Sequence, residues 1–303
     1  MSRIGLRNGT LYLAVGTLAA AMASGADFRA DSKLVLVPVT VLDRRGAIVK
    51  GLSNDAFTVT EDGSQRPIRS FSEDDAPVSL GIVLDMSGSM KGYLSAAKES
   101  LRALLQDANP GDEVFLNGVS TVPRAVSGFE DSFEETMRRA ESEGAAGRTA
   151  LIDAIYDSSR ELRAGLHARK ALVVISDGMD NHSRFTTEDM LRQQMESDAQ
   201  IYTIATVAAI NPVQPPKPMI MTEAQRGRAF LEGLAAKTGG LSFAVSSPSD
   251  IATAAAAIGR ALRNQYTIGY VPGEGASGKW RKIAVKVAGS GMKAYARPGY
   301  RVE

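Results

Sequence analysis

The chain has 303 residues, of which 44% are hydrophobic and 23% charged, a composition typical of a globular protein with about two domains. Its 35 basic and 34 acidic residues leave a net charge of +1, which argues against nucleic acid as a partner. Cysteine is absent, and the only histidines are His167 and His182. This composition excludes disulfides, thiolate metal sites, cysteine nucleophiles and histidine-rich metal sites.

The N-terminal segment has the pattern of an export signal. Arg3 and Arg7 precede an apolar run at residues 11–23, and small residues follow up to Ala26. We expect cleavage near Ala26, which makes residues 1–26 a signal peptide. The 13-residue run is shorter than the roughly 20 residues that a membrane span needs, which favours a cleaved signal. An uncleaved N-terminal anchor is the alternative. The sequence therefore predicts an exported protein, periplasmic or secreted, with no transmembrane segment after signal removal.

Residues 31–76 have the pattern of β-strands. The stretch 33–42 is rich in apolar and β-branched residues, as strands are. Two further strands, at 57–61 and 65–71, flank the dipeptide Asp62-Gly63, which is a strong hairpin signal.

Residues 78–263 alternate predicted strands with predicted helices. Such alternation is typical of a doubly wound α/β domain, with a mostly parallel sheet flanked by helices. The predicted strands lie at 78–84, 113–119, 171–176, 201–207 and 241–245, and the predicted helices at 91–108, 133–140, 150–166, 187–197, 227–237 and 248–263.

The C-terminal residues 265–303 return to the strand pattern, with strands predicted at 265–271, 280–288 and 292–296. Neither outer block is long enough for a comfortable core of its own. We therefore expect the N- and C-terminal strands to form one small β-sandwich, into which the α/β domain is inserted.

Polar side chains follow two of the predicted buried strands. Asp85, Ser87 and Ser89 come after one strand, and Asp177 after another, while Thr149 opens a predicted helix. In open parallel sheets, ligands bind at the carboxyl ends of the strands. Carboxylates and hydroxyls form an all-oxygen donor set, which suits Mg²⁺ or Mn²⁺. The alternative is that the serines and Thr149 only cap helices.

These residues carry a resemblance. The motif DMSGS at 85–89, Thr149 in GRTAL and Asp177 in ISDG match, in order, the metal-ion-dependent adhesion site (MIDAS) of von Willebrand factor type A domains. The resemblance covers residues 78–263. The C-terminal stretches look like part of a bacterial, exported group of these proteins; they are LRNQYTIGYVP at 262–272, WRKIAVKV at 280–287 and ARPGY at 296–300.

The resemblance implies a role for each of the five residues. Ser87, Ser89 and Thr149 are expected to bind a divalent ion through their hydroxyls, and Asp85 and Asp177 to act directly or through water. An Asp or Glu of a partner protein is expected to complete the metal shell. Asp180 and Asn181, which follow Asp177 closely in the chain, are expected either to lie beside this shell or to be solvated loop residues.

The function implied is metal-dependent protein–protein binding, for adhesion or assembly at the bacterial cell envelope, with no catalytic residue. A structural or scaffold subunit that does not use the metal is the alternative. A hydrolase is less favoured: His182 lies near Asp177 in the chain, but no Gly-x-Ser-x-Gly motif surrounds Ser87 or Ser89.

Overall fold

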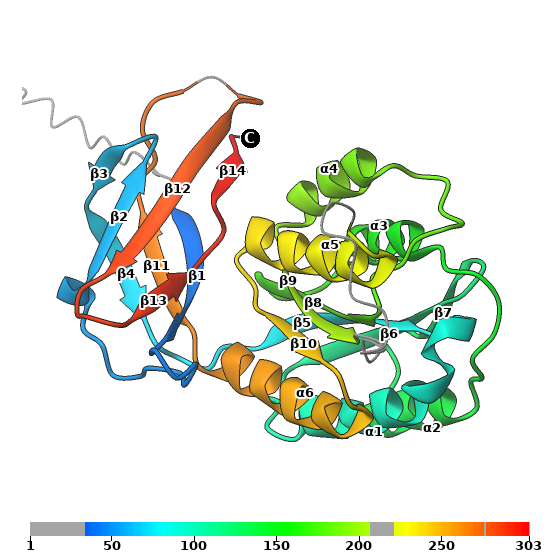
Figure 1. Ribbon diagram of the computed structural model, residues 1–303. Helices are drawn as coiled ribbons and strands as arrows, with labels where there is room; N and C mark the ends of the chain where they lie inside the picture. The colour runs from blue at the N-terminus through cyan, green and yellow to red at the C-terminus, as the bar shows by residue number, and fades with distance from the viewer. Residues whose placement is uncertain (1–33, 207–220, 276, 303) are drawn as a thin grey trace, which may run out of the picture. The chain divides into compact units, whose positions relative to one another are not determined.

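The computed structural model describes residues 34–206, 221–275 and 277–302 (Figure 1). The predicted signal peptide, residues 1–26, lies outside these described residues. In the described part of the chain, no helix combines the length and the apolar character needed to cross a membrane.

A six-stranded sheet forms the centre of the α/β domain, in the order β10-β9-β8-β5-β6-β7. Neighbouring strands are parallel, except that β7 runs antiparallel to β6 at one edge. The strands are β5 (Val78–Asp85), β6 (Glu113–Val119), β7 (Pro123–Ser127), β8 (Arg169–Ser176), β9 (Gln200–Thr206) and β10 (Ser242–Val245).

Strand β5 lies in the middle of this sheet, between β8 and β6, and all eight of its residues are buried. Its nearly continuous apolar run is what a strand covered on both faces requires. Leu84 pairs with Ile175 of β8. The next residues, Asp85 and Ser176, therefore end neighbouring strands at the same edge of the sheet.

Helices cover both faces of the sheet (Figure 1). One apolar core joins Leu80, Ile82 and Leu84 of β5 to the helices on one face, and a second core joins Val83 to the helices on the other. The first face carries α1 (Leu94–Leu105), α2 (Phe133–Glu141) and α6 (Pro248–Arg263). The second carries α3 (Leu151–Leu162), α4 (Thr187–Ser197) and α5 (Glu223–Thr238).

The N- and C-terminal strands form two four-stranded sheets, in the orders β13-β1-β11-β4 and β14-β12-β2-β3. Val39 and Tyr266 of the first sheet share one apolar core with Val59 and Ile283 of the second. The strands are β1 (Val35–Leu42), β2 (Phe57–Glu61), β3 (Ser64–Arg66), β4 (Ile68–Ser72), β11 (Tyr266–Tyr270), β12 (Trp280–Val287), β13 (Lys293–Tyr295) and β14 (Gly299–Arg301). A short 3₁₀ helix, η1 (Asn54–Ala56), precedes β2. The predicted fold class is confirmed: a mostly parallel α/β sheet is inserted between the strands of a small β-sandwich.

Some elements differ from the sequence prediction. The single strand predicted at 65–71 is two strands, because β3 pairs with β2 while β4 pairs with β11 in the other sheet. Pro67 lies between them and has no N–H to continue a ladder. The predicted helix 91–108 is preceded by a 3₁₀ turn, η2 (Gly88–Gly92), and α1 itself is shorter than predicted. Strands β7 and β14 were not predicted.

Candidate functional site

Asp85, the last residue of β5, has no solvent-exposed surface. One carboxylate oxygen, Oδ1, accepts a hydrogen bond from the Ser87 N–H at 2.9 Å, and Oδ2 accepts one from the Ser176 hydroxyl at 2.5 Å. Burial raises the pKa of Asp85 to about 6, against the lowering effect of these hydrogen bonds, and the nearby Asp177 carboxylate raises it further. The two predicted carboxylates are therefore in electrostatic contact.

The two predicted serines lie in the turn that leads from β5 into η2. Their hydroxyl oxygens are 3.1 Å apart, with Ser87 buried and Ser89 exposed. Ser87 stands at the N-cap position of η2, but its side chain makes no capping hydrogen bond. The helix-cap interpretation of this motif is therefore wrong for the Ser87 hydroxyl. The Gly88 N–H donates to the Gly147 carbonyl at 3.1 Å, which joins this turn to the loop before Thr149.

Thr149 is 2% exposed and lies just before α3. The N-cap residue of α3 is Ala150, and the helix start has no side-chain capping hydrogen bond from it. In residues 34–206, 221–275 and 277–302, the Thr149 hydroxyl forms no hydrogen bond. The alternative in which Thr149 caps its helix is therefore wrong, and its hydroxyl, which has no partner in these described residues, is available to a ligand.

Asp177 follows β8 directly and is half-buried. Its Oδ1 accepts a hydrogen bond from the Met179 N–H at 2.9 Å. Gly178 has a φ of +77°, which favours glycine at this turn. Gly227 of α5 packs directly against the Asp177–Gly178 peptide group, so α5 supports the backbone of this loop.

The segment after Asp177 contacts the Thr149 backbone. The Thr149 N–H donates to Asn181 Oδ1 at 3.0 Å, and the Thr149 carbonyl accepts from the N–H groups of Asn181 and His182, each at 3.0 Å. The His182 residue is exposed, and its imidazole forms no hydrogen bond within the described residues. The structure thus brings the three predicted loops together through direct hydrogen bonds.

The donor set at this edge of the sheet is entirely oxygen. Across the described ranges, no group of three or more His, Asp or Glu side chains is arranged to hold a metal, so a site here depends on hydroxyls as well as carboxylates. Neither Asp85 nor Asp177 forms an ion pair with a basic residue in the part of the chain that the structure describes. Two carboxylates without a basic partner, together with a hydroxyl that has no partner among the described residues, fit a hard divalent ion.

Ser176 is a residue of this site that the sequence prediction missed. Its hydroxyl donates to Asp85 Oδ2 and accepts from the Gly178 N–H at 2.9 Å, so it links the two carboxylate-bearing segments. Its signal in the sequence was a polar residue at the last position of an apolar strand.

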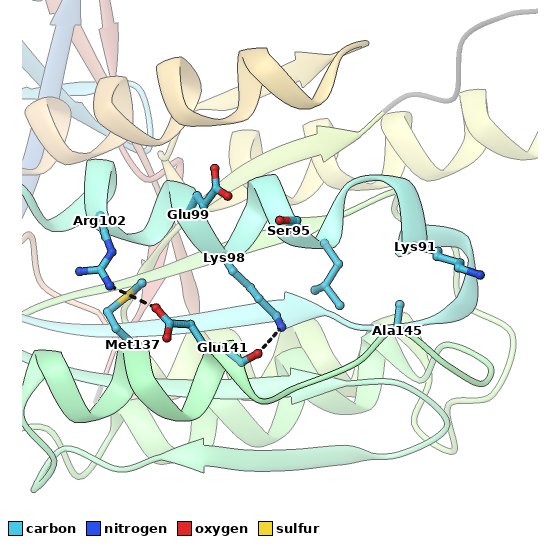
Figure 2. Close-up of a pocket in the computed structure, with 9 residues that line it drawn as sticks. Lys91, Ser95, Lys98, Glu99, Arg102, Met137, Glu141 and Ala145 are labelled. Atoms are coloured by element: carbon cyan, nitrogen blue, oxygen red, sulfur yellow. Dashed lines mark hydrogen bonds and ion pairs between the residues drawn. The ribbon is translucent and has the colours of Figure 1, made fainter.

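A groove of about 460 Å³ lies along α1, beside α2, and contains none of the five predicted ligands (Figure 2). Lys98 donates to the Glu141 carbonyl at 3.1 Å, and the Arg102 guanidinium pairs with the Glu141 carboxylate at 3.2 Å. Burial lowers the pKa of Lys98. The Arg102–Glu141 ion pair and the Lys98 hydrogen bond therefore join the two helices across the groove.

The sequence of residues 80–179 matches the von Willebrand factor type A domain. No curated protein sequence is significantly similar to this chain. Among solved structures, proximal thread matrix protein 1 from the mussel byssus is similar with a TM-score of 0.52 and 14% identity, over 67% of this chain and 51% of that chain. The α/β domain has the von Willebrand factor type A fold.

Two further solved structures are similar to this chain. The same mussel protein, solved with a zinc-occupied MIDAS motif, gives a TM-score of 0.52 and 14% identity over 68% of this chain and 50% of that chain. An aerotolerance-related membrane protein from Bacteroides fragilis gives 0.48 and 18% over 61% of this chain and 98% of that chain. The matched range of the type A domain, 80–179, includes all five predicted ligands.

Proposed function

We propose that this protein binds a protein partner through a divalent ion, Mg²⁺ or Mn²⁺, held by its type A domain. The observation that carries the proposal is that hydrogen bonds from Ser176 and to Asn181 bring the segments of Asp85, Asp177 and Thr149 together at one edge of the sheet. Burial and mutual repulsion raise the pKa of Asp85, and no basic side chain of the described residues neutralises either carboxylate. A divalent cation neutralises both carboxylates, and this favours its binding to the metal-free site.

Five side chains would hold the ion: Asp85, Ser87, Ser89, Thr149 and Asp177. The ion, when bound, supplies a Lewis acid that accepts an Asp or Glu carboxylate of the partner. The Ser176 hydroxyl and the Ser87 N–H orient the Asp85 carboxylate, and burial keeps water from it. The zinc at the MIDAS motif of the mussel protein, which has the same fold, supports an ion at this position.

The proposed setting is the bacterial cell envelope, in adhesion or assembly, with the protein exported to the periplasm or secreted. This part rests on the N-terminal export pattern and on the C-terminal resemblance. The role is binding without catalysis, and the exposed His182 imidazole, which pairs with no serine or aspartate in the described residues, supports that choice.

Electron paramagnetic resonance tests the proposal, because free Mn²⁺ loses its solution signal when it binds protein. We expect the protein to bind one Mn²⁺ per chain in competition with Mg²⁺, and Asp177→Ala to lose this binding. Asp107→Ala is the matched control, since Asp107 is exposed and forms no hydrogen bond or ion pair within the described residues. Both variants should melt at the wild-type temperature.

Two results would overturn the proposal. Wild-type protein that leaves the Mn²⁺ signal unchanged favours the metal-independent scaffold. Equal binding by wild type and Asp177→Ala places the ion elsewhere.

A further inference from the structure

We infer that Asn181 is a positioning residue of the metal centre, whose side-chain oxygen holds Thr149 in register with the Asp177 segment. This inference rests on the proposed function, because Thr149 matters there as a metal ligand. From the sequence, Asn181 could be either a residue beside the site or a solvated loop residue, and this inference assigns it the first role.

The backbone of Thr149 is bonded on both sides to Asn181. Its N–H donates to Asn181 Oδ1 at 3.0 Å, and its carbonyl accepts from the Asn181 N–H at 3.0 Å. Both polar groups of the Thr149 backbone are therefore held by one residue, which lies four positions after Asp177. The position of the Thr149 hydroxyl relative to Asp177 depends on this exchange.

The N-terminus of α3 is capped from outside the helix. The Ile152 N–H donates to Asp180 Oδ1 at 3.1 Å, and the Asp153 N–H donates to the Ser183 hydroxyl at 3.1 Å. These are donors that a residue at the helix start normally satisfies. The loop after Asp177 therefore supplies the cap that Ala150 does not.

The connection is reciprocal. The Asp153 carboxylate, which is 2% exposed, accepts hydrogen bonds from the N–H groups of Arg184 and Phe185, each at 2.9 Å. Helix α3 and segment 180–185 therefore form one hydrogen-bonded unit. Within this unit, the Asn181 side chain is the one that bonds to Thr149 directly.

Because Asn181 is exposed, substituting it can change the position of Thr149 without unfolding the protein. Its side chain lies at the surface, so truncation removes the bond to Thr149 without opening a cavity in the apolar core. Residues that orient metal ligands typically change metal affinity 10–100-fold when they are lost. We therefore expect metal affinity to fall while the fold is kept.

The experiment compares three variants at one position by Mn²⁺ titration with electron paramagnetic resonance. Asn181→Ala removes the acceptor, and Asn181→Gln moves it by one methylene; each should weaken Mn²⁺ binding about tenfold or more. Asn181→Asp keeps an acceptor oxygen at the same reach, so it should restore affinity. The melting temperature of each variant should fall by no more than about 4 °C.

Asn109→Ala is the matched control. Asn109 Oδ1 also accepts a backbone hydrogen bond, from the Gly111 N–H at 2.9 Å, but it lies before β6, at the opposite edge of the sheet. This variant should bind Mn²⁺ as the wild type does. Equal affinity of the wild type, Asn181→Ala and Asn181→Gln would overturn the inference.

A second readout does not depend on the metal. In metal-free protein, hydrogen exchange at the Thr149 amide should be faster in Asn181→Ala and Asn181→Gln than in the wild type, and slow again in Asn181→Asp. If the wild type binds no Mn²⁺, the proposed function fails, and this exchange pattern still decides whether Asn181 positions Thr149. Unchanged Thr149 exchange in Asn181→Ala would refute the positioning role.

Discussion

Helix α5 supports the Asp177 loop through a glycine that leaves no room for a side chain. A methyl group placed on Gly227 would overlap the Asp177 carbonyl oxygen and lie 3.0 Å from the Gly178 carbonyl carbon. To restore an ordinary contact distance of about 3.5 Å, the helix or the loop must move by about 1 Å. Gly227→Ala should therefore displace Asp177 from the proposed metal site.

Gly233, a second glycine of α5, shows what a glycine-to-alanine change does to stability when no overlap occurs. A methyl group on Gly233 meets nothing within 4 Å, so Gly233→Ala should stabilise the protein by about 1 kcal/mol through helix propensity alone. Gly227→Ala receives the same gain but adds an overlap that costs about 1–3 kcal/mol. We expect Gly227→Ala to be the less stable variant by about that difference, and to bind Mn²⁺ at least about tenfold more weakly.

Urea unfolding and Mn²⁺ titration of the two variants, beside the wild type, test this reasoning. Gly233→Ala should retain wild-type Mn²⁺ affinity. If Gly227→Ala matches Gly233→Ala in both stability and affinity, α5 does not support the Asp177 loop and the reasoning is refuted.

Two further predictions concern pH. Burial raises the pKa of Glu61. The Gly273 N–H, the Tyr300 hydroxyl and two arginines together outweigh this effect, so the pKa lies below its ordinary value of 4.5. Its stabilisation is present above that value and is lost as pH falls through the folded-state pKa. Glu61→Gln, which removes the buried carboxylate that pairs with both Arg66 and Arg281, should cost about 3 kcal/mol in urea unfolding at about pH 7 and much less at about pH 3; equal costs would contradict this. In metal-free protein the pKa of Asp85 is raised from 3.8 to about 6, so its ionisation destabilises the fold as pH rises through that interval. Asp85→Asn should then raise metal-free stability by about 3 kcal/mol at about pH 7.5 and by little at about pH 4, as thermal melts would show; a loss of stability at the higher pH would contradict this.

Local patterns predicted most elements because periodicity and capping are short-range properties. Helix α4 begins and ends at the predicted residues, and its N-cap Thr186 forms a capping box with Asp189. The division of 65–71 into two strands was missed, because the distant strand with which each part pairs does not show in the sequence, although Pro67 marks the break. Strand β14 has three residues, too few to show a period.

The candidate site shows the same limit. The predicted Asp85 and Asp177 follow neighbouring strands, since each comes directly after an apolar run that the sequence makes visible. Ser176 and Asn181 act through contacts with residues 91 and 32 positions away in the chain, respectively. No spacing in the sequence indicates such pairs, so their roles emerged only with the fold.

The most direct test of the metal centre is anomalous diffraction from crystals of the protein soaked in Mn²⁺. The account predicts one strong anomalous peak bounded by oxygen atoms of Asp85, Ser87, Ser89, Thr149 and Asp177, and its loss when Asp177→Ala crystals are soaked in the same way. Mn²⁺ bound elsewhere on the chain, with no peak among these five residues, would contradict it.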